Sequence, residues 1–210
     1  MRINKQKILA LTIPVILVLS TLMGSEANAQ SAPLSWGFKA GINASTIYGD
    51  NVNDVEAQAG FNGGIYLNYR FNNWSLQPEV FYSMKGAELD QGFSGQTDYE
   101  FGYLSVPVLV KYHFVTKSSL EPTLYAGPQM GFSLYGDADD QEIDDSLADT
   151  EFSLAFGGGL DLLTAKHPSD FIQKVGLDLR YTLGLTNLFD VTGDPEAKNS
   201  AFSAAVILGF

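Results

Sequence analysis

Residues 34–46, LSWGFKAGINAST, alternate between two kinds of side chain at every step. One set of alternate positions is apolar and comprises Trp36, Phe38, Ala40, Ile42 and Ala44. The positions between them are small, polar or charged and comprise Gly37, Lys39, Gly41, Asn43 and Ser45. Because successive side chains of a strand point to opposite sides, this pattern is typical of a β-strand whose two faces lie in different environments.

Seven further segments repeat the alternation. They span residues 60–71, 74–85, 100–114, 121–135, 151–164, 173–187 and 199–210. The connections between them mostly alternate in length. NN and VTKSSL after the second and fourth strands are short, AKHPSDFI after the sixth is intermediate, and longer segments such as GDADDQEIDDSLADT follow the other strands. Short turns at one end and long loops at the other are typical of transmembrane barrels with an even number of strands. We therefore predict an all-β fold, an eight-stranded antiparallel up-and-down transmembrane β-barrel.

Prolines fall inside several predicted strands, notably Pro78, Pro107 and Pro128. Proline donates no backbone hydrogen bond, and a closed barrel has no free edge on which to place it. Each proline is expected to require a β-bulge or a missing ladder bond.

The first 29 residues have the features of a cleaved secretory signal peptide. Basic residues precede a 16-residue apolar run at 8–23, and Ala27–Ala29 has the small-x-small form of a cleavage site. The predicted division is a signal at 1–29 and one barrel domain at 30–210. A retained helical anchor is the alternative, although the run is shorter than the roughly 20 residues that a helical span needs.

The predicted mature chain is strongly acidic. The signal contains three of the 12 basic residues and one of the 24 acidic ones, which leaves a net charge of −14. This charge disfavours nucleic acid as a partner and disfavours polyanions outside a local pocket. The chain contains no cysteine, so the exported protein forms no disulfides.

Five segments in this order resemble the PorT-like outer-membrane β-barrel family of Bacteroidetes, a broad group of small eight-stranded barrels. They are WGFKAGINAST, SLQPEVFYSMKGA, YLSVPVLVKYHF, LYAGPQMGFSL and DLRYTLGLTNL. The resemblance implies a location in the outer membrane of a Gram-negative bacterium of the Bacteroidetes type. One member of the family is associated with protein secretion and gliding. The resemblance implies no single activity and defines no functional residues.

If the apolar face contacts lipid, the charged residues of the opposite face line the lumen. They are Lys39, Arg70, Glu79, Lys85, Lys111, Glu121, Asp161, Asp178 and Arg180. The interior of an eight-stranded barrel is only wide enough for side chains to fill it. We therefore expect a packed network of ion pairs, because an unpaired buried charge is unfavourable. An ion or proton pathway is the alternative.

Catalysis of the kind known for some outer-membrane lipid hydrolases needs a histidine base beside a serine nucleophile. The two histidines, His113 and His167, both fall at the short-turn end, and the spacing suggests no serine and carboxylate partner for either. We predict that the chain is not an enzyme, has no catalytic residues and uses no cofactor.

The acidic loop is a weak candidate for divalent cations through Asp137, Asp139, Asp140, Glu142, Asp144 and Asp145. It lacks the turn glycine and the spaced terminal glutamate of an EF-hand. We expect a solvated loop without a metal site.

The last predicted strand, AFSAAVILGF, ends on Phe210. In the outer-membrane proteins that this chain resembles, a terminal aromatic strand is read by the insertion machinery. Phe210 is therefore a candidate assembly signal. The expected partners are outer-membrane lipid, this machinery and other envelope proteins.

Three functional interpretations follow. The first is a small outer-membrane barrel that anchors exposed loops for envelope or surface interactions. The second is a component of a secretion or gliding apparatus that acts by protein contacts. The third is a soluble periplasmic ligand-binding barrel of the lipocalin type, with its apolar residues inside and its charges in water.

Overall fold

The computed structural model describes residues 34–49, 55–90, 96–138, 141–142, 150–164, 170–186 and 197–210. Its strands are β1 (Leu34–Gly49), β2 (Val55–Phe71), β3 (Trp74–Asp90), β4 (Gln96–His113), β5 (Leu120–Ala138), β6 (Gln141–Glu142), β7 (Thr150–Leu163), β8 (Lys174–Gly184) and β9 (Ala197–Gly209). Within this described part, no helix is long and apolar enough to cross a membrane.

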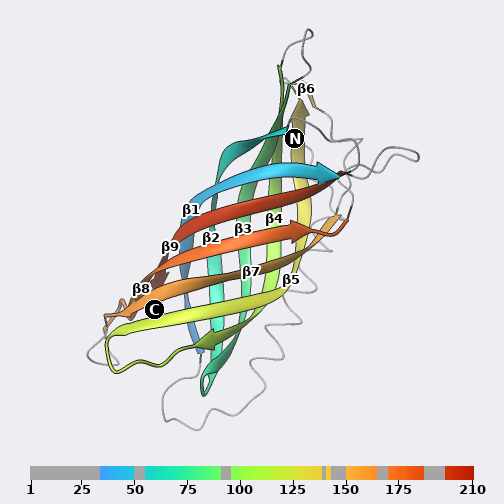
Figure 1. Cartoon of the computed structure of the whole chain (residues 1–210). Helices are drawn as coiled ribbons and strands as arrows, with labels where there is room; N and C mark the ends of the chain where they lie inside the picture. The colour runs from blue at the N-terminus through green and yellow to red at the C-terminus, as the bar shows by residue number, and fades with distance from the viewer. Residues whose placement is uncertain are drawn as a thin grey trace. The chain divides into compact units, whose positions relative to one another are not determined.

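Eight of these strands close on themselves (Figure 1). Each pairs antiparallel with the next, and β9 completes the ring by pairing with β1 from Gly37↔Gly209 to Gly49↔Ala197. The two-residue β6 pairs antiparallel with the end of β5, through Asp137↔Glu142 and Ala138↔Gln141, and is not part of the ring. The predicted eight-stranded antiparallel barrel is confirmed.

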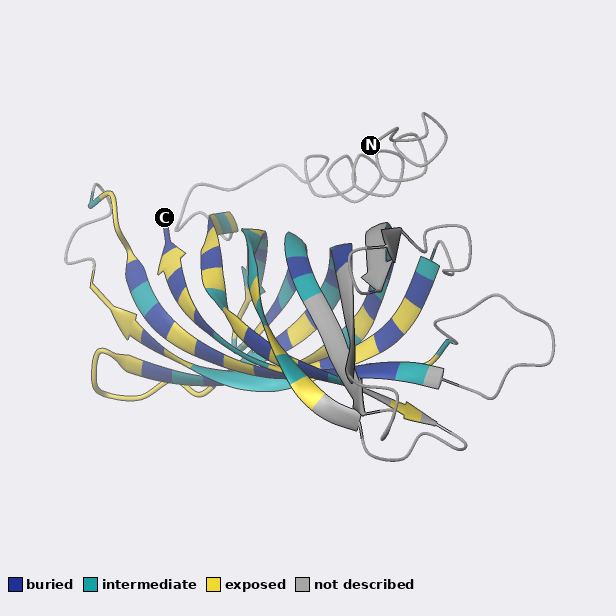
Figure 2. Cartoon of the chain, turned by 90° about the horizontal axis from the view of Figure 1, so that it is seen from above, coloured by how far each residue is buried: buried dark blue, intermediate teal, exposed yellow. Residues whose placement is uncertain are grey.

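The alternation of the sequence becomes an alternation between the outer wall and the lumen. Figure 2 shows it as bands of exposed and buried residues along the strands. On β1, the side chain of Ile42 is 69% exposed on the outer wall, whereas Lys39 is 8% exposed in the lumen. Apolar residues outside and polar residues inside are the arrangement of a membrane barrel. The lipocalin interpretation, which required the reverse, is wrong.

Most strands extend beyond the predicted segments. The second strand, predicted from residue 60, begins at Val55, and the third continues to Asp90. These extensions lie at the long-loop end, where the apolar positions are small or aliphatic, such as Ala57 and Leu89, and not aromatic. Backbone hydrogen bonds form whatever the side chains are, so a ladder can continue beyond the apolar wall.

The prolines are accommodated without a change of register. The β4–β5 ladder pairs Pro107 with Gln129 and next pairs Val110 with Ala126, so ladder pairs are missing beside Pro107 and Pro128 while the offset stays constant. The two register shifts occur elsewhere, in β2–β3 between Ala57 and Asn62 and in β4–β5 at Gly102 and Tyr103. Of the two predicted alternatives, the structure adopts the missing ladder bond.

The short turns define one end of the barrel. Phe71 pairs with Trp74 around the two-residue turn between β2 and β3, and Asn72 has a φ of 57°. Asparagine tolerates this left-handed conformation better than most residues, which fits its place in a tight hairpin.

Candidate functional site

The centre of the lumen contains a four-membered ionic cluster. Lys39 Nζ donates a hydrogen bond to Glu79 Oε1 at 3.0 Å and to Asp178 Oδ1 at 3.1 Å. Arg180 Nη2 donates to Glu79 Oε2 at 2.7 Å. All four side chains are buried, and they come from β1, β3 and β8. The two positive and two negative charges therefore compensate one another across the barrel.

Tyr125 joins this cluster from β5. Its hydroxyl donates to Asp178 Oδ1 at 2.9 Å and accepts from Arg180 Nε at 3.3 Å. Its ring lies 5.6 Å from Lys39 Nζ, measured to the ring centroid, within the range of cation–π attraction. Gly157 makes space for this tyrosine, since a Cβ at that position would lie 2.7 Å from the Tyr125 hydroxyl.

A second group lies near the short-turn end. Arg70 donates two hydrogen bonds to Glu121, at 3.0 and 2.8 Å. His113 Nδ1 lies 2.7 Å from Glu121 Oε1, and His113 Nε2 lies 2.9 Å from Ser75 Oγ. The Arg70 side chain is 34% exposed, which makes it the most accessible member of the group.

Two amides connect the groups. Asn68 Nδ2 donates to Ser75 Oγ and to Gln77 Oε1, both at 2.9 Å. Gln77 Nε2 then donates to Glu79 Oε1 at 2.7 Å. A continuous hydrogen-bonded chain therefore runs from Arg70 at the rim to the central cluster.

Ser75, His113 and Glu121 have the order and spacing of a serine–histidine–carboxylate relay. The expectation that neither histidine has such partners is wrong for His113, while His167 lies outside the described residues. The serine, however, is completely buried, and its Oγ also accepts the hydrogen bond from Asn68. An acyl substrate has no access to this oxygen, so the arrangement has relay geometry without an open reaction site.

A third group centres on Asp161 of β7. Its Oδ2 accepts from Lys174 Nζ at 2.9 Å, and Lys111 Nζ lies 3.8 Å from the same oxygen. Lys111 and Asp161 are completely buried. Neither Lys111 Nζ nor Asp161 Oδ1 has a hydrogen-bond partner within the part of the chain that the structure describes.

The structure therefore brings eight of the nine predicted lumen residues into three neighbouring polar groups, while the side chain of Lys85 lies outside the described residues. Sequence reasoning missed several members of these groups: Asn68, Ser75, Gln77, His113, Tyr125 and Lys174. Most of them share the lumen face with a predicted residue, so the alternation was a signal that could have identified them.

The acidic loop is described only in part. Asp139, Asp140, Asp144 and Asp145 lie outside the described residues, and only the backbones of Asp137 and Glu142 are placed, opposite each other in the β5–β6 pair. Among the described residues, no three potential metal ligands lie together.

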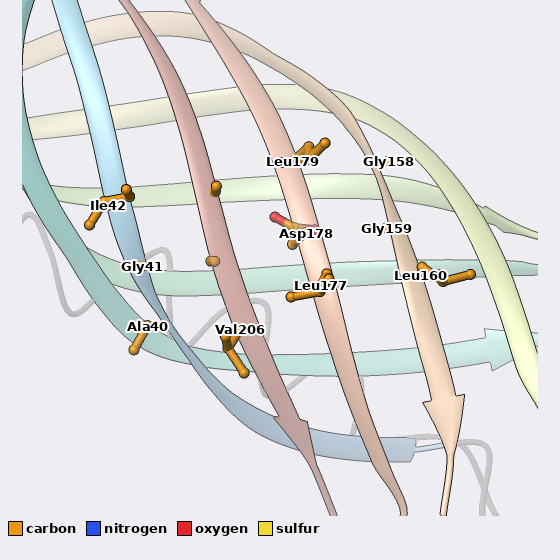
Figure 3. Close-up of a pocket in the computed structure, with 12 residues that line it drawn as sticks. Ala40, Gly41, Ile42, Gly158, Gly159, Leu160, Leu177, Asp178, Leu179 and Val206 are labelled. Carbon is orange, nitrogen blue, oxygen red and sulfur yellow. The ribbon is translucent and has the colours of Figure 1, made fainter.

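The outer wall carries a shallow hollow of about 750 Å³ over β1, β9, β8 and β7 (Figure 3). Gly158 and Gly159 leave the wall without side chains beside Leu160. The only charged residue that lines the hollow is Asp178, and its carboxylate accepts hydrogen bonds from Lys39 and Tyr125 in the lumen. The hollow is therefore an apolar feature of the wall.

One protein-family model matches most of the chain. Residues 28–190 match the model of the family described as "Outer membrane protein beta-barrel domain". Among curated proteins, none matches the chain significantly.

The chain is also similar to solved structures, at low sequence identity. Neisserial surface protein A is 18% identical, with a TM-score of 0.52, over 85% of this chain and 98% of that one. Ail of Yersinia pestis, in complex with the heparin analogue sucrose octasulfate, is 17% identical, with a TM-score of 0.45, over 84% and 99%. Outer membrane protein W of E. coli is 12% identical, with a TM-score of 0.37, over 83% and 97%.

Proposed function

The chain belongs to the outer membrane protein beta-barrel domain family, and from this premise we propose that it anchors exposed loops at the cell surface for envelope or surface interactions. A β-barrel in the outer membrane of a Gram-negative bacterium has lipid as its immediate partner. In this role the barrel is a closed scaffold and is neither a pore nor an enzyme.

The packed ionic lumen is the observation that supports this proposal. Glu79, Lys39 and Arg180 meet near the middle of the barrel with exposures of 3, 8 and 5%. Ion pairs that cross a lumen this narrow leave no continuous path for a solute. Interaction with partners is then a task for the loops at the long-loop end, whose sequences are acidic and polar.

Reconstitution tests the closed scaffold. The purified, heat-modifiable barrel in planar bilayers should show no steady conductance, and liposomes that contain it should not swell in sugar solutions. A large porin is the positive control for both assays. Reproducible conductance from the wild-type barrel would show that the lumen is open and would refute this part of the proposal.

Loop exchange tests the anchoring role. A variant in which residues 50–54, 91–95, 143–149 and 187–196 are replaced by glycine–serine links should keep the heat-dependent gel shift of a folded barrel. It should lose any binding to surfaces or envelope proteins that whole cells show with the wild type. Retention of binding by this variant would place the interaction on the wall instead.

The PorT-like resemblance supports a second proposal, a role in a secretion or gliding apparatus. Deletion of the gene should then abolish export of a surface protein, whereas a general anchoring role leaves export unchanged. The cells should be complemented with the loop-exchanged variant as well as the wild type, because an apparatus role through the loops is restored by the wild type alone.

A further inference from the structure

The charges of the buried side chains at the centre of the lumen do not sum to zero. Four basic side chains and three carboxylates are buried there: Lys39, Lys111, Lys174 and Arg180 against Glu79, Asp161 and Asp178. The Arg70–Glu121 pair is neutral by itself. Glu151 lies ten residues before Asp161 on β7, about 33 Å along an extended strand, and bonds there with Ser153 and Asn199.

Lys111 carries the unbalanced charge. The carboxylate nearest to it, Asp161, already accepts a hydrogen bond from Lys174 at 2.9 Å, whereas Lys111 Nζ remains 3.8 Å away. The ammonium group has three donors, none of which has an acceptor within the described part of the chain. A completely buried ammonium without an acceptor is strongly unfavourable, so the site requires a further group.

A second donor without a partner occurs nearby. The hydroxyl of Tyr66, which is 2% exposed, has no hydrogen-bond partner among the described residues. Lys174 links it to the same region, since Lys174 Nζ lies 5.5 Å from the centroid of the Tyr66 ring and 2.9 Å from Asp161. Asp161 Oδ1 and Asp178 Oδ2 are acceptors that also have no hydrogen-bond partner among the described residues, but the excess charge of this region is positive.

From these observations we infer that the lumen binds one small monovalent anion of the halide class against Lys111 Nζ. Water alone supplies acceptors but does not offset the charge, whereas a halide does both. Asp161 Oδ1 accepts no hydrogen bond from any residue that the structure describes and needs water as its donor, so the anion shares the chamber with water. Only a shielded internal site suits an anion in a chain this acidic.

Thermal unfolding of the detergent-solubilised barrel tests the site. Sodium chloride or bromide should raise the unfolding midpoint of the wild type by about 3 °C over sodium gluconate at equal ionic strength. Lys111→Met should abolish the difference, because it removes the charge and keeps the bulk. Lys117→Met, in the exposed turn after β4, is the matched control and should retain it.

Equal midpoints in halide and gluconate for the wild type, or a halide effect that persists in Lys111→Met, would overturn the inference. Crystals of the wild type grown in bromide provide a readout that does not depend on how the variant folds. Anomalous density at hydrogen-bond distance from Lys111 Nζ is expected. Density that refines as water without an anomalous signal would overturn the inference.

Discussion

The ring of Phe210 stacks on the indole of Trp36 with their centroids 4.9 Å apart, and the two residues also exchange backbone hydrogen bonds in both directions. Phe38 and Phe171 contact the same phenylalanine ring at 5.9 and 4.8 Å. The last residue of the chain is therefore held between β1 and the connection that follows β7. This contact lies at the seam where β9 meets β1.

We predict that Phe210 contributes both to assembly of the barrel and to the stability of the folded barrel. Phe210→Ala keeps the backbone bonds to Trp36 but loses the ring contacts, which should lower the free energy of unfolding by about 1–3 kcal/mol. Phe171→Ala loses one ring contact and leaves the terminal residue intact. If Phe210 is an assembly signal, its replacement should reduce the yield of heat-modifiable barrel in cells far more than Phe171→Ala does. Equal yields from the two variants would contradict the signal.

The central cluster yields a prediction about stability. Glu79→Gln leaves Lys39 and Arg180 without their shared carboxylate, so it should lower the free energy of unfolding by about 3–5 kcal/mol. Urea titration in detergent micelles, followed by gel mobility, measures this loss. The double variant with Arg180→Met should lose less than the sum of the single variants, because one of the stranded charges is then absent. Additive losses would show that the pair does not interact.

The alternation of side chains was sufficient to predict the closed barrel and which residues enter the lumen. It could not predict contacts that depend on register and strand curvature. Lys39 and Asp178 are 139 residues apart, and they meet because β1 and β8 both pair with β9. Ser75 and His113 meet because Ser75 pairs with Lys111 on the neighbouring strand. The spacing of these residues along the chain predicts neither contact, which is why the relay geometry was missed.

The ends of the strands could also not be predicted exactly from the sequence, for a physical reason. Side-chain alternation predicts the end of a strand well only where the contrast between its two faces is large. In the β2 and β3 extensions the apolar positions of the sequence are small or aliphatic, such as Ala57 and Leu89, so the pattern is weak there. The backbone still pairs, and the pair Glu56↔Glu88 lies beyond the predicted ends.

A matched pair of glycines tests how tightly the lumen is packed. Gly157→Ala places a methyl group against Leu179 O and 2.7 Å from the Tyr125 hydroxyl, so it should displace the tyrosine and lower the free energy of unfolding by about 1–3 kcal/mol. Gly63→Ala meets its nearest atom at 3.6 Å and should be neutral or slightly stabilising. Both variants are measured by the same urea titration. A loss at Gly63 as large as that at Gly157 would mean that strand conformation, not lumen packing, determines the effect.

The buried relay of Ser75, His113 and Glu121 should not react with reagents in solution. Ser75 Oγ lies 2.9 Å from His113 Nε2, and a solvent-accessible serine in this geometry would react with a fluorophosphonate. Because Ser75 is completely buried, we expect no labelling of the folded barrel in detergent, in parallel with an outer-membrane serine hydrolase that is labelled. Ser75→Ala should instead lower the free energy of unfolding by about 1–3 kcal/mol, since it removes one buried hydrogen-bond partner from His113 and one from Asn68. Labelling of the wild type that disappears in Ser75→Ala and in His113→Gln would show that the relay is open and that the barrel is an enzyme. Labelling that persists in both variants would come from another nucleophile and would leave the buried relay unchallenged.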